Sequence, residues 1–322
     1  MADTFKFRID HHGSLVRPPE VIAARAANDP NLRAIEDAAI AEAVRKQRRL
    51  SLTVVTDGHF RRAELAGAVL DAVHGFEDGK LTAERSLVAD DTAAIAAQTQ
   101  IPAKATLPSP AWIAARTFRP GGPWASAREL GEALALLLRA EIEAVISRGV
   151  RLIQIDDHGY GESLYNGGVL SFEDALAVDA LAVTVADKPF DVRIGLCPLT
   201  RVGDGLDTAA AERLFAAVPV DRWVLPYDTG SPAETELLRA VPSERDVCLG
   251  IVDPRVPELE DVGTVMDRMD VVASIRDIED VAISPSAGFA DVAGQPLIGV
   301  EDQWRKLIHV ETFARMCWGN EL

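Results

Sequence analysis

A set of ionisable and nucleophilic side chains follows directly on short apolar runs of this sequence. Its members are His12, His59, Asp156, Asp157, His158 and Cys197. An imidazole titrates near neutral pH, so an imidazole oriented by a carboxylate can serve as a general acid or base. Imidazole, carboxylate and thiolate groups are also the ligands that hold zinc and related metals in proteins. The pattern therefore predicts either acid–base chemistry or a metal centre.

A second set of polar side chains stands at the same places in the chain, and we expect these side chains to contact the substrate. They are His12, Ser14, Arg17, Arg61, Tyr227, Asp228 and Arg255. Arginine holds carboxylates and phosphates through paired hydrogen bonds. The three arginines therefore predict a small, polar or anionic substrate.

Eight short, β-rich runs can position these residues. They are residues 5–12, 52–58, 103–109, 151–157, 192–198, 222–228, 247–253 and 281–287. Most are almost continuous in Val, Ile and Leu, as expected for parallel strands that are covered on both faces. Longer segments of helical period separate them, and this alternation predicts an α/β fold, a (β/α)8 TIM barrel. The alternative is a doubly wound open sheet. The sequence argues against it, because no predicted strand is followed by a glycine-rich nucleotide-binding turn.

The barrel interpretation treats residues 1–322 as a single domain with an excursion at about 59–102, in which FEDGKL is expected to form a small hairpin over the barrel mouth. Helices are expected at 18–50, 125–149 and 171–187, with a last one after residue 298. In a TIM barrel the reactive residues lie at the carboxyl ends of the strands. The two sets of polar residues stand at these ends, so we expect them to share one pocket.

Composition narrows the class of protein. The net charge of −17 opposes nucleic-acid binding, which needs a basic face. No run approaches the roughly 20 apolar residues of a membrane span, and the N-terminus has no secretory signal. Three cysteines without framework spacing fit a reducing compartment, so we expect a cytoplasmic enzyme. Trp304 and Trp318 are expected to lie either in the core or at the interface of a homo-oligomer.

At the strand ends the sequence resembles the cobalamin-independent methionine synthase family, especially its short, single-barrel members. The resemblance is carried by HHGSLVRP (11–18), VTDGHFRR (55–62), LPSP (107–110), LIQIDDHGYGE (152–162) and GIVDPRVPELED (250–261), which occur in the family's order over nearly the whole chain. It implies the barrel shared with uroporphyrinogen decarboxylase, and a zinc ion that binds homocysteine as its thiolate for methyl transfer. It also implies that Asp156 matches the aspartate that holds the substrate's amino group.

The chain departs from this family at the zinc ligands. Where the family has His-x-Cys after the fifth strand, this sequence has Gly195, Leu196 and Cys197. The expected glutamate after the sixth strand is missing, and Ala287 stands in the segment that should hold a cysteine. Catalytic zinc needs three good protein ligands, so the standard zinc site is predicted not to be intact.

Four hypotheses stay open. In the first, a relocated divalent metal such as zinc is held by His12, His59, His158 and Cys197, with a neighbouring aspartate. In the second, Asp157 and His158 act as an acid–base pair without a metal, in a lyase, decarboxylase or hydrolase. In the third, the protein transfers a methyl or alkyl group to a thiol near Cys197. In the fourth, it is a non-catalytic binding protein.

Overall fold

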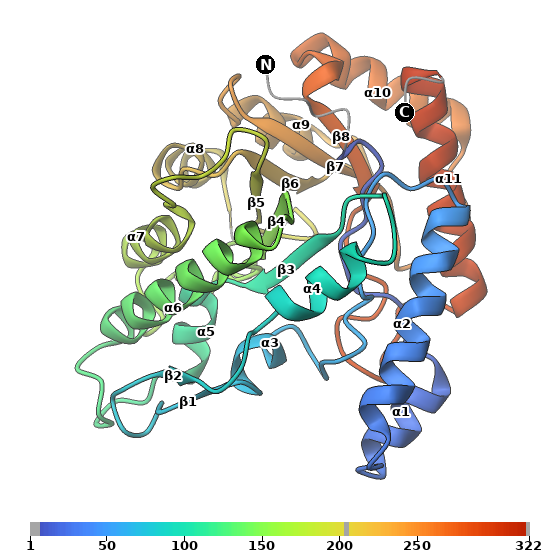
Figure 1. Ribbon diagram of the computed structural model, residues 1–322. Coiled ribbons are helices and arrows are strands. Elements are labelled where there is room, and N and C mark those ends of the chain that lie inside the picture. Colours follow the sequence, from blue (N-terminus) through green and yellow to red (C-terminus); the bar gives the residue numbers. More distant parts are fainter. Residues whose placement is uncertain (1–6, 203–205, 320–322) are drawn as a thin grey trace.

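A parallel sheet of six strands forms most of the barrel wall in the computed structural model, which describes residues 7–202 and 206–319 (Figure 1). Its strands are β3 (Lys104–Pro108), β4 (Leu152–Asp156), β5 (Arg193–Cys197), β6 (Arg222–Pro226), β7 (Asp246–Val252) and β8 (Val281–Pro285), each paired with the next. Every residue of these strands is buried, which agrees with their nearly continuous apolar sequences. The six strands predicted from residue 103 onwards are confirmed.

The ring is completed by two segments that pair only briefly. Asp10 N donates to Ile283 O of β8 at 2.9 Å, and Thr53 N donates to Ile9 O at 3.2 Å. On the far side, Lys104 N of β3 donates to Val55 O at 2.9 Å. The predicted strands 5–12 and 52–58 thus lie in their barrel positions but form single bridges, at Ile9 and Val55. One reason is that Ile9 N bonds the Thr53 hydroxyl, at 2.8 Å, rather than a main-chain carbonyl. Residues 5 and 6 lie outside the described residues.

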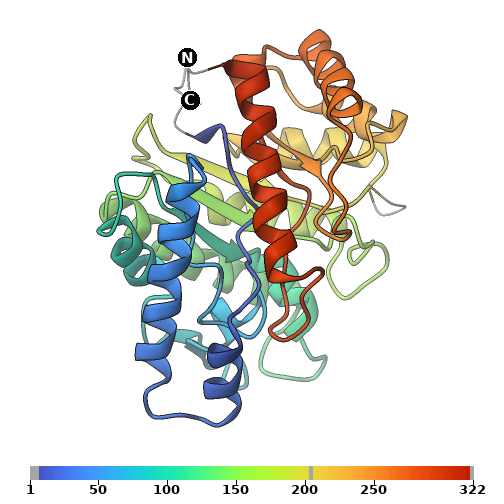
Figure 2. The ribbon, with the colours of Figure 1, turned by 90° about the vertical axis from the view of Figure 1, so that its right-hand side faces the viewer.

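Helices surround this ring (Figure 1). They are α1 (Pro19–Ala26), α2 (Leu32–Arg49), α3 (Gly67–Leu70), α4 (Ala89–Ala96), α5 (Pro110–Thr117), α6 (Ala127–Ser147), α7 (Phe172–Val183), α8 (Thr208–Ala217), α9 (Pro232–Ala240), α10 (Val262–Ile275) and α11 (Val300–Trp318). In both ribbon views α2 and α11 run side by side over the first segment (Figure 2), and Lys46 of α2 lies over the Trp304 ring of α11. Within the described ranges, no helix is long and apolar enough to cross a membrane.

The single helix predicted at 18–50 was wrong, because the structure has two helices, α1 and α2, joined by a turn. Asn28 adopts a left-handed φ of 49° in this turn, and Pro30 disfavours helical geometry at Asp29. The hairpin itself, predicted around FEDGKL, is confirmed, whereas its position over the barrel mouth stays a prediction. Its strands are β1 (Val73–His74) and β2 (Thr82–Ala83), which pair antiparallel.

Candidate functional site

Three side chains of the predicted set meet at the carboxyl ends of the strands. Asp156 ends β4 and Cys197 ends β5, and because they are register partners their side chains point the same way. His12 reaches them from the first segment, with Nε2 at 3.2 Å from Cys197 Sγ. One ligand atom from each of the three residues lies within 4.8 Å of the others, and all three residues are buried. We call His12, Asp156 and Cys197 the mouth cluster.

Burial opposes charge on each member of the mouth cluster. It raises the pKa of the Cys197 thiol well above its ordinary value, and it lowers the pKa of His12 well below its own. It also raises the pKa of Asp156 to about 6. The thiol has a second partner, the carbonyl of Leu199 at 3.3 Å. Without a cation to stabilise a thiolate, Cys197 is a poor nucleophile.

Side chains inside the barrel fix the orientation of Asp156. Gln154 Nε2 donates to Asp156 Oδ1 at 2.7 Å and to His12 O at 3.0 Å. Lys104 Nζ donates to Gln154 Oε1 and to Asp10 Oδ1, both at 2.8 Å. Sequence reasoning missed Lys104 and Gln154 as site residues. The available signal was a polar residue inside an apolar strand, two positions before Asp156 in the case of Gln154.

His158 borders the mouth cluster. Its ring centroid lies 6.2 Å from that of His12. Its Nε2 is buried and has no hydrogen-bond partner among residues 7–202 and 206–319. An imidazole that is held beside the cluster with a vacant nitrogen can accept or donate a proton there.

The structure does not bring the predicted acid–base pair of Asp157 and His158 together, because Asp157 follows the last residue of β4 and points to the opposite face from Asp156. The Asp157 carboxylate faces the helices, where it accepts hydrogen bonds from the Tyr165 hydroxyl at 2.7 Å and from Gly159 N at 2.9 Å. Next to it lies Asp179 of α7, which accepts from the Ser109 hydroxyl at 2.6 Å. Burial, and then the charge of Asp157, raise the pKa of Asp179 well above its ordinary value.

This buried carboxyl pair leads to a prediction about stability. The folded protein keeps a proton on Asp179 that the unfolded chain releases above about pH 4. The unfolded state therefore binds fewer protons above that pH, and the free energy of unfolding falls as pH rises toward the folded pKa. Asp179→Asn should weaken this fall, so that its stability relative to wild type grows from pH 5 to pH 8. Urea unfolding at several pH values measures this, with exposed Asp187→Asn as control; parallel curves would contradict the prediction.

His59 lies apart from the mouth cluster. It has a left-handed φ of 59°, and its Nε2 is buried without a hydrogen-bond partner in the described part of the chain. A Cβ on Gly13 would come within 2.6 Å of this nitrogen, so the glycine makes room for the ring. The group of close ligand atoms contains neither His59 nor His158.

Three of the residues that were predicted to contact the substrate make hydrogen bonds or ion pairs within the protein instead. Arg17 donates to the carbonyls of Ala290 and His59, and so ties the loops after strands one, two and eight together. Arg61 pairs with Asp37 on α2. Tyr227 lies in the core and its hydroxyl is 3.3 Å from Thr235 Oγ1 of α9. The structure does not bring these three side chains to the mouth cluster.

The other predicted contacts lie on the rim. Ser14 Oγ donates to Asp291 at 2.6 Å. Arg255 Nη1 lies 3.2 Å from Asp228 Oδ2, which also accepts from the Ser286 hydroxyl at 2.6 Å. The charge of Arg255 contributes, after burial and other charges, to the lowered pKa of His12, so Arg255 lies on the side of the rim that faces the cluster.

The mouth cluster fits a metal ion better than the family's zinc positions do. The space at Gly195 is bounded by Arg222 of the next strand, and no imidazole is present there. His12, Asp156 and Cys197 instead offer a nitrogen, an oxygen and a sulfur within reach of one ion. Three protein ligands with an open position are typical of catalytic zinc.

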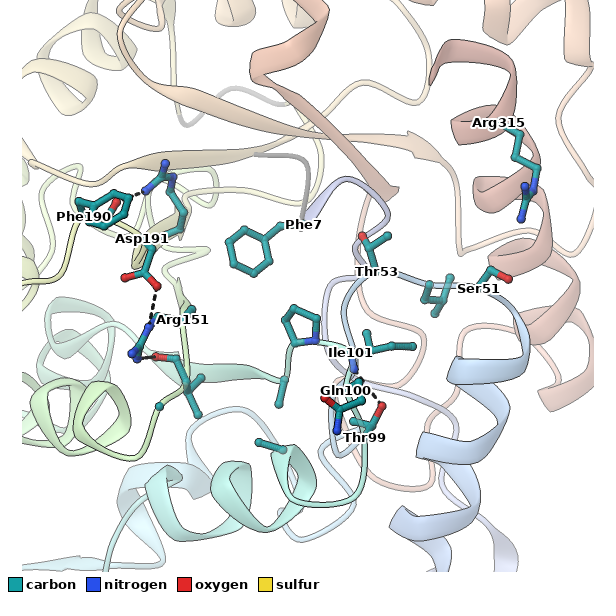
Figure 3. Close-up of a pocket in the computed structure, with 17 residues that line it drawn as sticks. Phe7, Ser51, Thr53, Thr99, Gln100, Ile101, Arg151, Phe190, Asp191 and Arg315 are labelled. Atoms are coloured by element: carbon teal, nitrogen blue, oxygen red, sulfur yellow. Dashed lines mark hydrogen bonds and ion pairs between the residues drawn. The ribbon is translucent and has the colours of Figure 1, made fainter. Parts of the chain in front are cut away.

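A cavity of about 1040 Å³ lies at the opposite end of the barrel. It is bordered by the amino ends of the strands, with Phe7, Thr53 and Arg151 among the residues drawn in Figure 3. Arg151 is already paired there with Asp191, at 3.0 Å. Conserved chemistry in TIM barrels lies at the carboxyl ends, so size alone does not make this cavity the reaction site.

Comparisons with known proteins agree with the fold. No protein-family model matches the chain. Two Bacillus subtilis proteins of uncharacterised function, YxjG and YxjH, are 27% and 28% identical to it, over 97% of this chain and 95% of theirs. Their similarity extends over essentially the whole barrel.

Several solved structures share the fold of this chain. A Listeria monocytogenes protein, provisionally named a vitamin-B12-independent methionine synthase, is 25% identical with a TM-score of 0.77 over 98% of both chains. A B12-independent methionine synthase from Shewanella sp. W3-18-1, solved with selenomethionine, has a TM-score of 0.74 at 16% identity, over 96% of this chain and 97% of that one. A methyltransferase from Methanosarcina mazei shares the fold at a TM-score of 0.56 and 10% identity, over 98% and 96%. The fold, the motifs at the strand ends and these relatives together show that the chain is similar to methionine synthase-like (β/α)8 barrels.

Proposed function

We propose that the chain is a metal-dependent transferase that moves a methyl or other small alkyl group from an alkyl donor to the sulfur of a thiol substrate, which loses its proton, at the mouth cluster. The observation that carries the proposal is the convergence of His12, Asp156 and Cys197, whose ligand atoms lie within 4.8 Å of one another. Similarity to the Listeria protein over 98% of both chains supports the choice of reaction. The functional unit is taken as the whole chain, 1–322, as one domain.

The three cluster residues act as ligands in this proposal. A divalent metal such as zinc supplies a Lewis acid that lowers the pKa of a thiol bound at its open position. The Cys197 thiol and the Asp156 carboxyl must lose their protons to bind it, because both have raised pKa values in the buried site. Gln154 fixes Asp156 with a hydrogen bond of 2.7 Å, so the carboxylate is held in position.

Two further residues complete the proposed site. The vacant, buried Nε2 of His158 is placed to take the proton of an incoming thiol. On the rim, Arg255 offers a charged group to a carboxylate of the substrate, although its Nη1 also pairs with Asp253 at 2.8 Å. These roles place the sulfur of the substrate at the cluster and its anionic end toward the loops.

Cobalt(II) provides a direct test of the metal centre and of its open position. Added to metal-free protein, one equivalent should produce the near-ultraviolet charge-transfer absorption of a thiolate–cobalt bond. Addition of homocysteine should then increase this absorption, because a second thiolate joins the metal. The same titration with homoserine, which carries a hydroxyl in place of the thiol, is the matched control.

Two outcomes contradict the proposal. Absence of any stoichiometric metal binding removes the metal centre and favours a metal-free acid–base reaction carried by His158. Metal binding with no response to any thiol leaves the centre but excludes transfer to sulfur.

A further inference from the structure

A second cavity, of about 450 Å³, lies between α2, the loop after the second strand, and β3. Its inner wall includes Lys104 and Thr106, which stand two residues apart on β3 and so share the face that points into the barrel. Lys104 contacts Gln154, the residue that holds Asp156. The cavity thus extends from the outer helices to the polar interior beside the mouth cluster.

The wall of this cavity is basic in an acidic protein. The chain as a whole has 50 acidic and 33 basic residues. The residues lining the cavity reverse this ratio, with six basic side chains against four acidic ones. Four of these six basic side chains already pair with a carboxylate, as Arg25 does with Glu36 and Lys104 with Asp10. The case for an anion therefore rests on a basic side chain that has no such partner.

Arg62 is the basic residue of this wall with the fewest partners. It is 6% exposed, and its one hydrogen bond runs from Nη1 to the carbonyl of Thr106, at 3.1 Å. Within residues 7–202 and 206–319, no carboxylate lies within ion-pair distance of its guanidinium. Burial lowers the pKa of Arg62, while the charges of Asp57, Asp156 and Asp91 raise it from beyond ion-pair distance. A buried charge that contacts no counter-ion is costly, and an oxyanion would supply a direct partner.

Two more hydrogen-bonding groups in the same wall lack partners. The Thr106 hydroxyl is buried and makes no hydrogen bond to any described residue. Nη1 of Arg61 is likewise buried and unbonded, while Nη2 of the same side chain pairs with Asp37. Buried polar atoms in native proteins are nearly always satisfied, so these two groups beside the guanidinium of Arg62 indicate a ligand.

We propose that this cavity binds an anionic group, a carboxylate or a phosphate, with the guanidinium of Arg62 as its main contact and Thr106 Oγ1 and Arg61 Nη1 as further donors. The anion is a further acidic group of the substrate, distinct from the one that faces Arg255, on a molecule whose reacting end lies at the mouth cluster. That second statement rests on the proposed function, whereas binding of the anion itself does not.

The test uses metal-free protein, so that it is independent of the metal centre. Orthophosphate and glutarate are titrated separately at low ionic strength and followed by calorimetry, which also shows which of the two anions the site prefers. One of them should bind with one-to-one stoichiometry. Arg62→Gln should weaken it about 10- to 100-fold, as expected for a buried hydrogen bond to a charged group. Arg239→Gln, the same change at an exposed arginine of α9, should leave the affinity unchanged.

A second variant tests the same proposal if Arg62→Gln does not fold. Thr106→Val removes a buried hydroxyl that has no partner in the free protein, so it should keep or raise the melting temperature while it weakens anion binding. A purely structural role of this wall predicts the reverse, with lost stability and no change in affinity. Failure of wild type to bind either anion, or equal affinity in wild type and both wall variants, overturns the proposal. Loss of cobalt binding with retained anion binding would instead count only against the metal centre.

Discussion

Cys197→Ser is expected to lower the affinity for zinc by more than about 100-fold, since even outer-shell substitutions at metal sites cost about 10- to 100-fold. Cys197 contributes the sulfur of the mouth cluster, and its Sγ lies 3.2 Å from His12 Nε2. A hydroxyl cannot replace it as a thiolate ligand at neutral pH. Transferase activity should fall with the metal content. The measurement is the metal bound per chain after dialysis against a zinc buffer, together with the thiolate–cobalt absorption.

Cys317→Ser is the matched control for this experiment. Cys317 is a half-buried thiol on α11 and belongs to no group of metal-ligating atoms among the described residues. It should bind zinc as tightly as wild type. His12→Gln should reproduce the loss seen in Cys197→Ser, because both remove one of three ligands. Unchanged zinc affinity in Cys197→Ser would show that any bound metal sits elsewhere.

Lys104→Met is expected to destabilise the fold by about 3–5 kcal/mol, the usual cost of removing one partner from a buried ion pair. Lys104 is fully buried inside the barrel, with Nζ at 2.8 Å from Asp10 Oδ1. Arg222, whose Nη1 lies 3.8 Å from Asp10, is the second cation near this carboxylate. Methionine fills a similar volume, so that loss of the charge and its hydrogen bonds dominates the effect. Urea unfolding followed by circular dichroism gives the free energy.

Lys80→Met provides the comparison at an exposed position of the hairpin loop, where a change within about 0.5 kcal/mol is expected. Lys104→Met should also weaken activity in the fraction that stays folded, because Gln154 loses the partner of its Oε1 and holds Asp156 less firmly. A destabilisation below about 1 kcal/mol would show that Asp10 finds another partner. In that case the interior network would not be what positions the mouth cluster.

The barrel could be predicted from the sequence because its signals are local. Strands such as 151–157 are continuous in apolar residues, and helices such as α6 have a clear period and a serine cap, Ser126. The break between α1 and α2 was also visible locally, at Pro30. The order of the elements then places the ends of all strands on one rim, and His12, Asp156 and Cys197 were recognised there.

The direction of each side chain could not be predicted with the same certainty. Adjacent residues such as His11 and His12 have the same type and the same place in the chain. Yet His11 packs outward on Gln47 of α2, at 2.8 Å, while His12 reaches Cys197. Asp156 and Asp157 divide in the same way. The direction of each side chain depends on which face of its strand meets the barrel interior. A register shift of one residue reverses that direction.

By itself, then, the sequence determined the eightfold alternation, the rim on which polar residues gather and the candidate residue types, because each depends on neighbours in the chain. Only the tertiary structure decided that Asp156 and not Asp157 joins His12 and Cys197. It also decided that Arg61 pairs with Asp37 of α2, while the buried guanidinium of Arg62 contacts no carboxylate of the described residues. The direction and the pairing of these side chains depend on strand register and on partners from distant segments. Contacts with those partners form only when the barrel closes.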